Sequence, residues 1–226
     1  MWLALDTATD QASVAVGGPG WCAAEETIIG ARRHAVALLP AIQGVLARAA
    51  GGLASIEGII LADGPGSFTG LRVGAAVAKA LVRGRSVRLW CAPSLLAVAR
   101  VAGGDETGTI LAVSDALRGA LYAAAYRFRP GVIETILEPT VVPVGEVLAR
   151  VPSPARIVGP AAAVLGGTTV WPRASALLSI VGVAGGAYAV TDPAGWEPVY
   201  GRPAEAQVQW ERTHGRALDH PVGRAG

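Results

Sequence analysis

The sequence predicts an α/β protein in which helices cover a mixed β-sheet. The first observation is the order of elements, because three strand-like segments precede alternating helical and strand-like segments, a βββαβα order typical of such sheets. The second is that both halves of the chain open with strands and an aspartate, Asp6 in the first half and Asp115 in the second. The third is composition: 226 residues with 52% hydrophobic residues can form a packed core and do not match a disordered chain.

The first half of the chain has the clearest periodicity. Short apolar runs predict strands over residues 2–5, 12–16 and 21–27, with a glycine-rich turn between the second and the third. Further predicted elements are a helix over 33–50, a buried strand over 58–62, a helix over 71–82, a strand over 87–91 and a helix over 93–102.

The second half follows a possible boundary at Gly103 to Glu106 and contains longer strands. The predicted elements are strands over 109–113, 120–128 and 132–142, a short helix near Glu146, a strand over 156–158 and a buried helix over 176–190. We therefore expect an N-terminal lobe over residues 1–103, a C-terminal lobe over 104–190 and an irregular tail over 191–226.

Charge, cysteines and hydropathy exclude several classes of protein. The formal net charge is only +2, which provides a weak field for nucleic acid. Cys22 and Cys91 are isolated in apolar segments, so we expect reduced thiols rather than a disulfide framework or a zinc site. Residues 174–190 are uncharged but number 17 and include three glycines, whereas a membrane span needs about 20 apolar residues. With no signal peptide at the N-terminus, we expect a cytoplasmic protein without membrane contacts.

A glycine-rich loop, Gly64 to Gly70, separates a buried strand from a helix. Its glycines would let the backbone approach a ligand, and the helix N-terminus would offer amide groups to a phosphate or another anion. The loop is not a P-loop, and its glycine spacing differs by one residue from the dinucleotide-binding motif. The alternative is a tight turn in which Ser67 or Thr69 caps the helix.

Other polar residues are weaker candidates for a catalytic or binding site. Asp6 and Thr7 follow the first strand, where an acid and a hydroxyl can assist phosphate binding or simply end the strand through local hydrogen bonds. The chain has three histidines but no Gly-x-Ser-x-Gly and no His-Glu-x-x-His motif. Leu38, not a second histidine, lies four residues after His34, so we predict no catalytic and no metal-ligating residues.

Two consecutive helices carry more apolar surface than a surface helix needs. On the first, Leu39, Ile42 and Leu46 share one face, and on the second Val77 and Leu81 form a ridge among alanines and glycines. These faces are either buried inside the monomer or available to a partner.

A series of motifs runs in order from residue 3 to about residue 210. They are Leu3-Ala4-Leu5-Asp6-Thr7-Ala8-Thr9, Ser13-Val14-Ala15, His34 with Leu38-Leu39-Pro40, the Gly64 to Gly70 loop continuing into Leu71-Arg72-Val73-Gly74, Pro93-Ser94-Leu95, Asp115-Ala116-Leu117-Arg118-Gly119 with Tyr122, and Glu197-Pro198-Val199-Tyr200. The series resembles the TsaB (YeaZ) family over nearly the whole chain, and the loop and the Asp-Thr-Ala-Thr start are its most specific parts.

The resemblance implies an actin-like ATPase (ASKHA) fold with two related lobes, each with a mixed sheet flanked by helices. Family members are partners in forming N6-threonylcarbamoyladenosine beside the tRNA anticodon: the paralogue TsaD transfers the threonylcarbamoyl group, TsaB is its dimerisation subunit, and the ATPase TsaE joins them in bacteria. The resemblance thus implies a non-catalytic subunit that binds a TsaD-type transferase and a TsaE-type ATPase and reaches tRNA only through the complex. The free chain is either a monomer or a homodimer, and no cofactor is expected except a nucleotide in the assembled complex.

The resemblance also implies two sets of site residues. The first two long helices form the family's heterodimer interface, which maps here to residues 33–50 and 70–82. The expected interface residues are His34, Leu38, Leu39, Ile42, Leu46, Leu71, Arg72, Gly74, Val77 and Leu81. The expected vestigial phosphate loop consists of Asp6, Thr7, Gly64, Gly66, Ser67, Thr69 and Gly70. The paralogue's His-x-x-x-His metal pair is reduced here to His34 followed by Leu38.

Two departures and two alternatives accompany this interpretation. Gly201-Arg202 follows Tyr200 where the family usually has Leu-Arg, and Leu117 stands where an arginine is common, which weakens the expectation of a ligand role for Asp115.

One alternative function is a small ATP-dependent phosphotransferase of the same fold that uses the loop. The other is a metallopeptidase-like protein, for which the sequence supplies no metal ligands.

Overall fold

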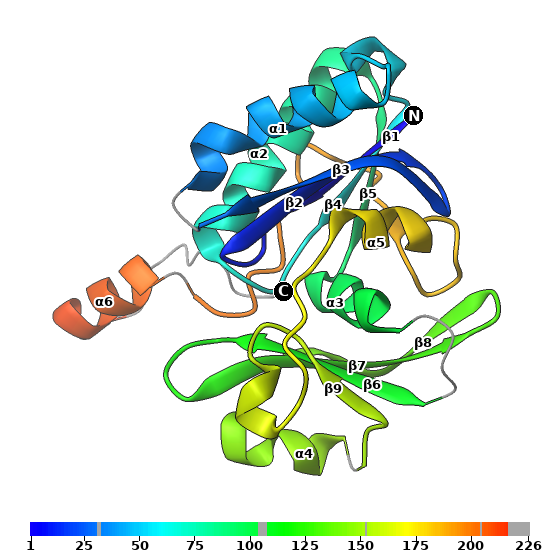
Figure 1. Ribbon diagram of the computed structural model, residues 1–226. Helices are drawn as coiled ribbons and strands as arrows, with labels where there is room; N and C mark the ends of the chain where they lie inside the picture. The colour runs from blue at the N-terminus through cyan, green and yellow to red at the C-terminus, as the bar shows by residue number, and fades with distance from the viewer. Residues whose placement is uncertain (31–32, 104–107, 152, 204, 217–226) are drawn as a thin grey trace.

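Two β-sheets lie on either side of a central pair of helices, and further helices cover their outer faces (Figure 1). The computed structural model describes residues 1–30, 33–103, 108–151, 153–203 and 205–216. This arrangement confirms the predicted mixed α/β class with two sheets flanked by helices. No helix of these described ranges is long and apolar enough to cross a membrane.

The first sheet has six strands in the order β10-β5-β4-β1-β2-β3. The strands are β1 (Trp2–Asp6), β2 (Gln11–Gly18), β3 (Trp21–Ile29), β4 (Gly58–Ala62), β5 (Arg88–Ala92) and β10 (Tyr188–Ala189). β1 pairs antiparallel with β2 and parallel with β4, and β4 pairs parallel with β5. The carboxyl ends of β1, β4 and β5 therefore lie at one edge of the sheet, next to the glycine-rich loop.

Two long helices cover the outer face of the first sheet (Figure 1). They are α1 (His34–Arg48) and α2 (Phe68–Arg85), and a short 3-10 helix at Leu53–Ser55 precedes β4. α1 packs on the sheet through its apolar face. Leu38, Ile42 and Leu46 on this face belong to the same buried cluster as Leu3 and Leu61 of the sheet. The two predicted helices are confirmed, and α2 is extended by about one turn toward the loop.

The second sheet has four strands in the order β8-β7-β6-β9. The strands are β6 (Thr109–Asp115), β7 (Ala120–Arg129), β8 (Val132–Pro143) and β9 (Arg156–Val158). Its outer face is covered by α4 (Val147–Arg150) and by 3-10 helices at Val144–Glu146 and Ala162–Leu165. Leu111 and Val113 of β6 pack there against Val147.

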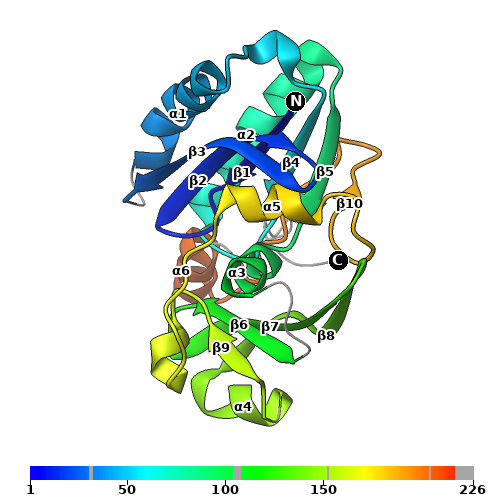
Figure 2. The ribbon, with the colours of Figure 1, turned by 45° about the vertical axis from the view of Figure 1, so that its right-hand side comes forward.

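The central helices α3 (Ser94–Ala102) and α5 (Ala174–Ile180) lie between the two sheets (Figure 2). They belong to one hydrophobic core that includes Trp2 and Ile60 of the first sheet and Tyr126 of the second. The inner faces of both sheets are thus buried by the same pair of helices, and the two lobes share a core.

The predicted helix over 176–190 is wrong beyond Ile180. α5 ends at Ile180, and the chain then turns through Gly182 and Gly185, both with positive φ (79° and 73°), a conformation that glycine adopts without strain. The segment 188–189 instead forms β10, which pairs antiparallel with β5. α5 and β10 therefore pack on the first sheet, although the predicted division of the chain at residues 103 and 190 assigned them to the second lobe. The turn between them contacts the second sheet, where the Ile133 amide donates to the Ala184 carbonyl at 2.8 Å.

The tail is not wholly irregular, because α6 (Glu205–His214) follows the last extended segment. Its helix is stabilised by local pairs rather than by an apolar stripe: Gln207 donates to Glu211 at 2.9 Å, and the Trp210 and His214 rings stack at 4.3 Å. Hydrophobic periodicity is lacking here, so the prediction missed this helix, although the segment is rich in the strong helix formers Glu, Ala and Gln. Apart from Gly103, the predicted boundary at Gly103 to Glu106 lies outside the described residues.

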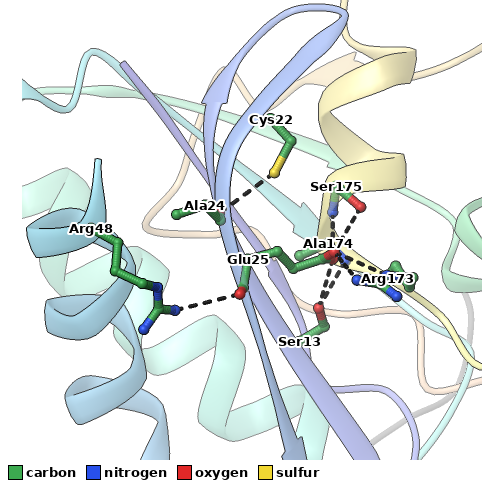
Figure 3. A network of polar contacts seen from close by, with 8 residues as sticks. All are labelled: Ser13, Cys22, Ala24, Glu25, Arg48, Arg173, Ala174 and Ser175. Atoms are coloured by element: carbon green, nitrogen blue, oxygen red, sulfur yellow. Dashed lines mark hydrogen bonds and ion pairs between the residues drawn. The ribbon is translucent and has the colours of Figure 1, made fainter. Parts of the chain in front are cut away.

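A cluster of polar contacts around Glu25 attaches α5 to the first sheet (Figure 3). Glu25, on β3, accepts hydrogen bonds from the Ser175 amide (3.0 Å), the Ser13 hydroxyl (3.1 Å) and Arg173 Nε (2.9 Å). The Ser13 hydroxyl in turn accepts from the Ala174 amide at 3.0 Å. The first turn of α5 is thereby held by side chains of β2 and β3, far away in sequence.

Candidate functional site

The glycine-rich loop leads from β4 into α2, and its helix cap is Ser67. The Ser67 side chain accepts a hydrogen bond from the Gly70 amide at 3.3 Å, while the Ser67 amide donates to the Ala8 carbonyl at 2.7 Å. The predicted capping turn is therefore confirmed with Ser67 as the cap. Two amides that a phosphate would use already bind groups of the protein itself.

The glycines of this region accommodate neighbouring backbone. A Cβ atom on Gly66 would lie 2.2 Å from the Ala8 carbonyl oxygen, and one on Gly70 would lie 2.0 Å from that of Thr7. A Cβ atom on Gly64, which has a φ of 117°, would lie 2.0 Å from the Val199 oxygen. The loop is therefore in close contact with the turn after β1 and with the tail. Backbone atoms of these segments occupy the space that a side chain at each glycine would need, so this space is closed to a ligand.

Asp6 and Thr7 lie beneath this loop and are fully buried. Asp6 Oδ1 accepts from the Ala8 amide at 3.0 Å, while Asp6 Oδ2 and Thr7 Oγ1 have no hydrogen-bond partner among the described residues. Burial raises the pKa of Asp6 to about 7, against the smaller lowering effect of the Ala8 amide. Both predicted site residues are therefore enclosed by the surrounding protein.

Asp63 is a buried acid near the loop that the sequence prediction did not single out. It directly follows β4, is 3% exposed, and accepts a hydrogen bond from the Tyr188 hydroxyl at 2.5 Å on Oδ2. Burial raises its pKa to about 6, and the Tyr188 hydrogen bond acts in the opposite direction. The available signal was its position, since an acid at the end of a buried parallel strand beside β1 must lie near Asp6.

A cavity of about 410 Å³ lies in front of the loop, between the two sheets. Residues from both lobes line it, among them Asp10, Gly66, Ser67, Thr69, Asp115, Tyr122, Trp171, Tyr200 and Arg202. The tail forms one wall: the Tyr122 hydroxyl donates to the Tyr200 carbonyl at 3.2 Å, and Arg202 donates to the Ala116 carbonyl at 2.7 Å. The exposed acids at this cavity are Asp10 and Asp115 rather than the predicted Asp6.

The described residues offer no assembled metal-binding group. They include no set of three or more His, Cys, Asp or Glu side chains placed to hold a metal ion. His34 begins α1 but is 2% exposed, and burial lowers its pKa. Leu38, in the place of a second ligand, is buried in the core.

The expected interface helices divide into buried and exposed sides. Of the expected residues, His34, Leu38, Ile42, Leu46, Leu71 and Gly74 are buried within this chain. On α1, Leu39 is 54% exposed and its neighbour Val36 is 73% exposed. On α2, Arg72 is exposed, while Val77 and Leu81 are half-buried against the first sheet's core. A partner could therefore contact only the side of each helix that faces away from the sheet. We call this side the outer row; it includes Val36 and Leu39 on α1 and Val73 and Val77 on α2.

Comparison with known proteins places the chain in a family. A family model described as "TsaD: tRNA N6-adenosine threonylcarbamoyltransferase" matches residues 28–189, well over half of the chain. The protein named "tRNA threonylcarbamoyladenosine biosynthesis protein TsaB" of Escherichia coli is 33% identical over 147 residues, 62% of this chain and 63% of that protein. Its namesake from Haemophilus influenzae is 36% identical over 124 residues, 53% of this chain and 51% of that protein. The alignments thus span less than two thirds of these relatives.

Solved structures agree over a longer range. A Pseudomonas aeruginosa crystal structure, described as an uncharacterized protein with similarity to peptidase YEAZ, superposes with a TM-score of 0.77 at 27% identity, covering 89% of this chain and 99% of that one. A second structure, "YeaZ from Pseudomonas aeruginosa", has a TM-score of 0.70 at 26% identity, covering 80% of this chain and 90% of that one. These neighbours and the family model fit an actin-like ATPase (ASKHA) fold. The chain therefore belongs to the TsaD-type threonylcarbamoyltransferase family, and within that family to the TsaB (YeaZ) proteins.

Proposed function

We propose that this chain is a non-catalytic subunit that binds a TsaD-type transferase and supports the formation of N6-threonylcarbamoyladenosine beside the tRNA anticodon. A TsaE-type ATPase would be a further partner, and tRNA would be reached through the complex. The naming of its relatives as tRNA threonylcarbamoyladenosine biosynthesis proteins supports the pathway.

The observation that carries the partner role is the apolar outer row of α1 and α2. Val36 and Leu39 are large apolar side chains with most or half of their surface exposed, on a helix whose opposite side is fully packed. α2 lies beside α1 on the same face of the first sheet (Figure 1) and adds the half-buried Val73 and Val77. An exposed apolar row on two adjacent helices favours docking of a partner helix.

The observation that supports a non-catalytic role is the closed glycine loop. Its Ser67 and Gly70 amides bind the protein itself, and Asp6 is enclosed beneath it. These features disfavour the alternative of a phosphotransferase that uses the loop for ATP, and submillimolar ATP binding by the lone chain would revive it. A metallopeptidase would require stoichiometric zinc or iron in the purified protein. Any nucleotide in the assembled complex remains a prediction, and we would place it in the cavity of about 410 Å³ between the sheets.

Co-purification with the TsaD-type paralogue tests the proposal. Leu39→Asp is expected to abolish capture, because it places a charge in the centre of the apolar row, while its thermal midpoint stays near that of the parent. Val164→Asp is the matched control, because Val164 is a 62% exposed apolar residue on the second lobe. Retained capture with Leu39→Asp, or equal loss with both variants, contradicts the proposed interface. Full transferase activity from the isolated chain contradicts the non-catalytic role.

A further inference from the structure

The two helices of the proposed interface carry an unbalanced charge. α1 and α2 contain five of the 19 lysine and arginine residues of the chain and none of its 17 aspartate and glutamate residues. The rest of the chain therefore has more acidic than basic residues, although the formal net charge of the whole chain is +2. Positive charge is thus concentrated on the same helices that carry the exposed apolar residues.

Two of the five basic side chains are paired within the chain. Arg48 of α1 lies 2.9 Å from Glu26 of β3, and Lys79 of α2 lies 3.2 Å from Glu197 of the tail. The other three are exposed arginines of α2, and none of them forms an ion pair with the described residues. The positive charge of these three guanidinium groups is therefore available to a partner.

Two of these arginines lie at the ends of one exposed stripe of α2. Arg72 and Arg83 are 11 positions apart, which corresponds to about three helical turns and about 16 Å along the helix axis. The exposed positions between them on this stripe are Ala76 and Ala80. The Arg72 guanidinium lies 5.5 Å from the centre of the Phe68 ring, a contact that orients the group and leaves its charge uncompensated.

α1 contributes the apolar part of the same face. α1 and α2 lie side by side on the outer face of the first sheet (Figure 1). The exposed positions of α1 include Val36, Leu39, Pro40 and Gln43, none of which is charged. The face thus combines an apolar row on α1 with an arginine at each end of the neighbouring stripe of α2.

We propose, building on the partner role above, that this face selects a partner helix that has an apolar stripe with an acidic residue at each end, about three turns apart. The two carboxylates would pair with Arg72 and Arg83 at the rim, where arginine and carboxylate form parallel hydrogen bonds. The apolar stripe of the partner would cover Val36 and Leu39. Complementary rim charges raise the association rate and reject partners of the wrong charge.

A second copy of this chain matches the face poorly. In a two-fold dimer the same patch lies on both subunits, so the arginines of each copy would face helices that contain no acidic residue. Like charges placed opposite one another across an interface lower the affinity. The charge pattern therefore favours a different protein as the occupant.

RNA is also a poor match for this face. Proteins that bind the phosphate backbone present clustered lysine and arginine side chains along the path of the strand. Here alanines occupy the stripe between Arg72 and Arg83, and the neighbouring row on α1 is uncharged. An apolar surface with charge only at its ends favours a protein helix.

Association kinetics with the purified TsaD-type transferase test the proposal, measured at about 0.1 M and about 1 M salt. The Debye length falls from about 10 Å to about 3 Å between these concentrations, so rim charges are screened at the higher one. The association rate constant of the parent is expected to fall about tenfold at high salt. Arg72→Glu and Arg83→Glu should each lower it about fivefold at low salt and have a smaller effect at high salt.

Two further variants serve as controls. Arg72→Lys keeps the positive charge and should retain most of the parent's association rate at low salt. Arg150→Glu reverses an exposed arginine in the last turn of α4, on the second lobe, and should leave association unchanged. The thermal midpoint reports whether each variant is folded, and Arg83→Glu carries the test if Arg72→Glu does not fold.

Four results overturn the proposal. The first two are an association rate of the parent that does not depend on salt, and an effect of Arg150→Glu as large as that of Arg72→Glu. A low-salt dimer of the parent that Leu39→Asp dissociates would identify a second copy as the occupant. Binding of tRNA by the lone chain that both Arg72→Glu and Arg83→Glu abolish would identify RNA instead.

The same measurements separate the acidic partner helix from the partner role itself. Binding that is lost in Leu39→Asp and unaffected by Arg72→Glu and Arg83→Glu retains the partner role and rejects the acidic helix. Failure of the parent to bind the transferase at either salt concentration rejects the partner role.

Discussion

Glu25 connects two parts of the chain that are far apart in sequence. Burial alone would raise the pKa of this carboxyl, but hydrogen bonds from Arg173 and Ser175 outweigh the burial and hold the pKa below its usual value. The same contacts hold the first turn of α5, so a single side chain stabilises the packing of the central layer on the first sheet.

Glu25→Gln is expected to lower the free energy of unfolding by about 2 kcal/mol, because charge-assisted hydrogen bonds to Arg173 and Ser175 are lost. Urea unfolding at about pH 7 measures this. Glu26→Gln is the matched control: its 2.9 Å pair with Arg48 is exposed on both sides, and such pairs contribute about 0–1 kcal/mol.

The pH dependence gives a second measurement for the same residue. A carboxyl whose folded pKa is lowered contributes stability above its unfolded pKa and loses that stability as the pH falls through the folded pKa. The difference between the parent and Glu25→Gln should therefore shrink in acid. Equal losses for Glu25→Gln and Glu26→Gln would show that the cluster does not stabilise α5.

At the scale of elements, α2 shows how one helix serves two environments. Its first turns press against the segment after β1, where Gly70 and Gly74 leave room for Thr7. Its last turns are exposed, and a Cβ atom on Gly84 would meet nothing within 4 Å. Close contact with Thr7 therefore requires glycine at positions 70 and 74, whereas no contact in the structure requires glycine at position 84.

Alanine substitution separates these cases. Gly84→Ala is expected to raise the free energy of unfolding by up to about 1 kcal/mol through helix propensity. Gly70→Ala should instead lower it by at least about 2 kcal/mol, because its Cβ atom would lie 2.0 Å from the Thr7 carbonyl oxygen. Chemical denaturation measures both, and a Gly70→Ala variant as stable as Gly84→Ala would contradict the close contact.

At the scale of the whole molecule, the tail joins the two lobes. Tyr200 is 5% exposed, packs on Phe68 beside the glycine loop, and accepts a hydrogen bond on its carbonyl from Tyr122 of the second sheet. Arg202 continues the connection by donating to the Ala116 carbonyl at the end of β6. The motif Glu197 to Tyr200 therefore has a structural role in this chain, between the sheets.

Tyr200→Ala is expected to destabilise the chain by about 3–5 kcal/mol, the usual cost of removing a large buried aromatic side chain. Val199→Ala is the control, because Val199 is 43% exposed and its backbone hydrogen bond to Asp63 survives the substitution. Urea unfolding compares the two. A small effect of Tyr200→Ala, similar to that of Val199→Ala, would show that the tail does not hold the lobes together.

The sequence by itself determined the α/β class, nearly all strands and the two long helices, because periodicity is a local property that each segment carries in its own residues. It also located the glycine loop and named Ser67 and Thr69 as candidate caps, of which the structure has Ser67. The motif order indicated the family that the comparisons confirmed. It failed at residues 181–190 and in α6, where tertiary pairing and local side-chain contacts replace hydrophobic periodicity.

Only the tertiary structure decided what the candidate residues do. Asp6 became an enclosed acid because the glycine loop, whose Gly66 and Gly70 lie against Ala8 and Thr7, closes over the end of β1, although the loop is far from β1 along the chain. The interface helices likewise divided into a buried row with Leu38 and an exposed row with Leu39, which adjacent letters of equal hydropathy cannot distinguish. The burial and the charge state of a side chain depend on the residues packed around it in the folded protein. Many of these residues are distant in sequence, so a local sequence pattern does not contain this information.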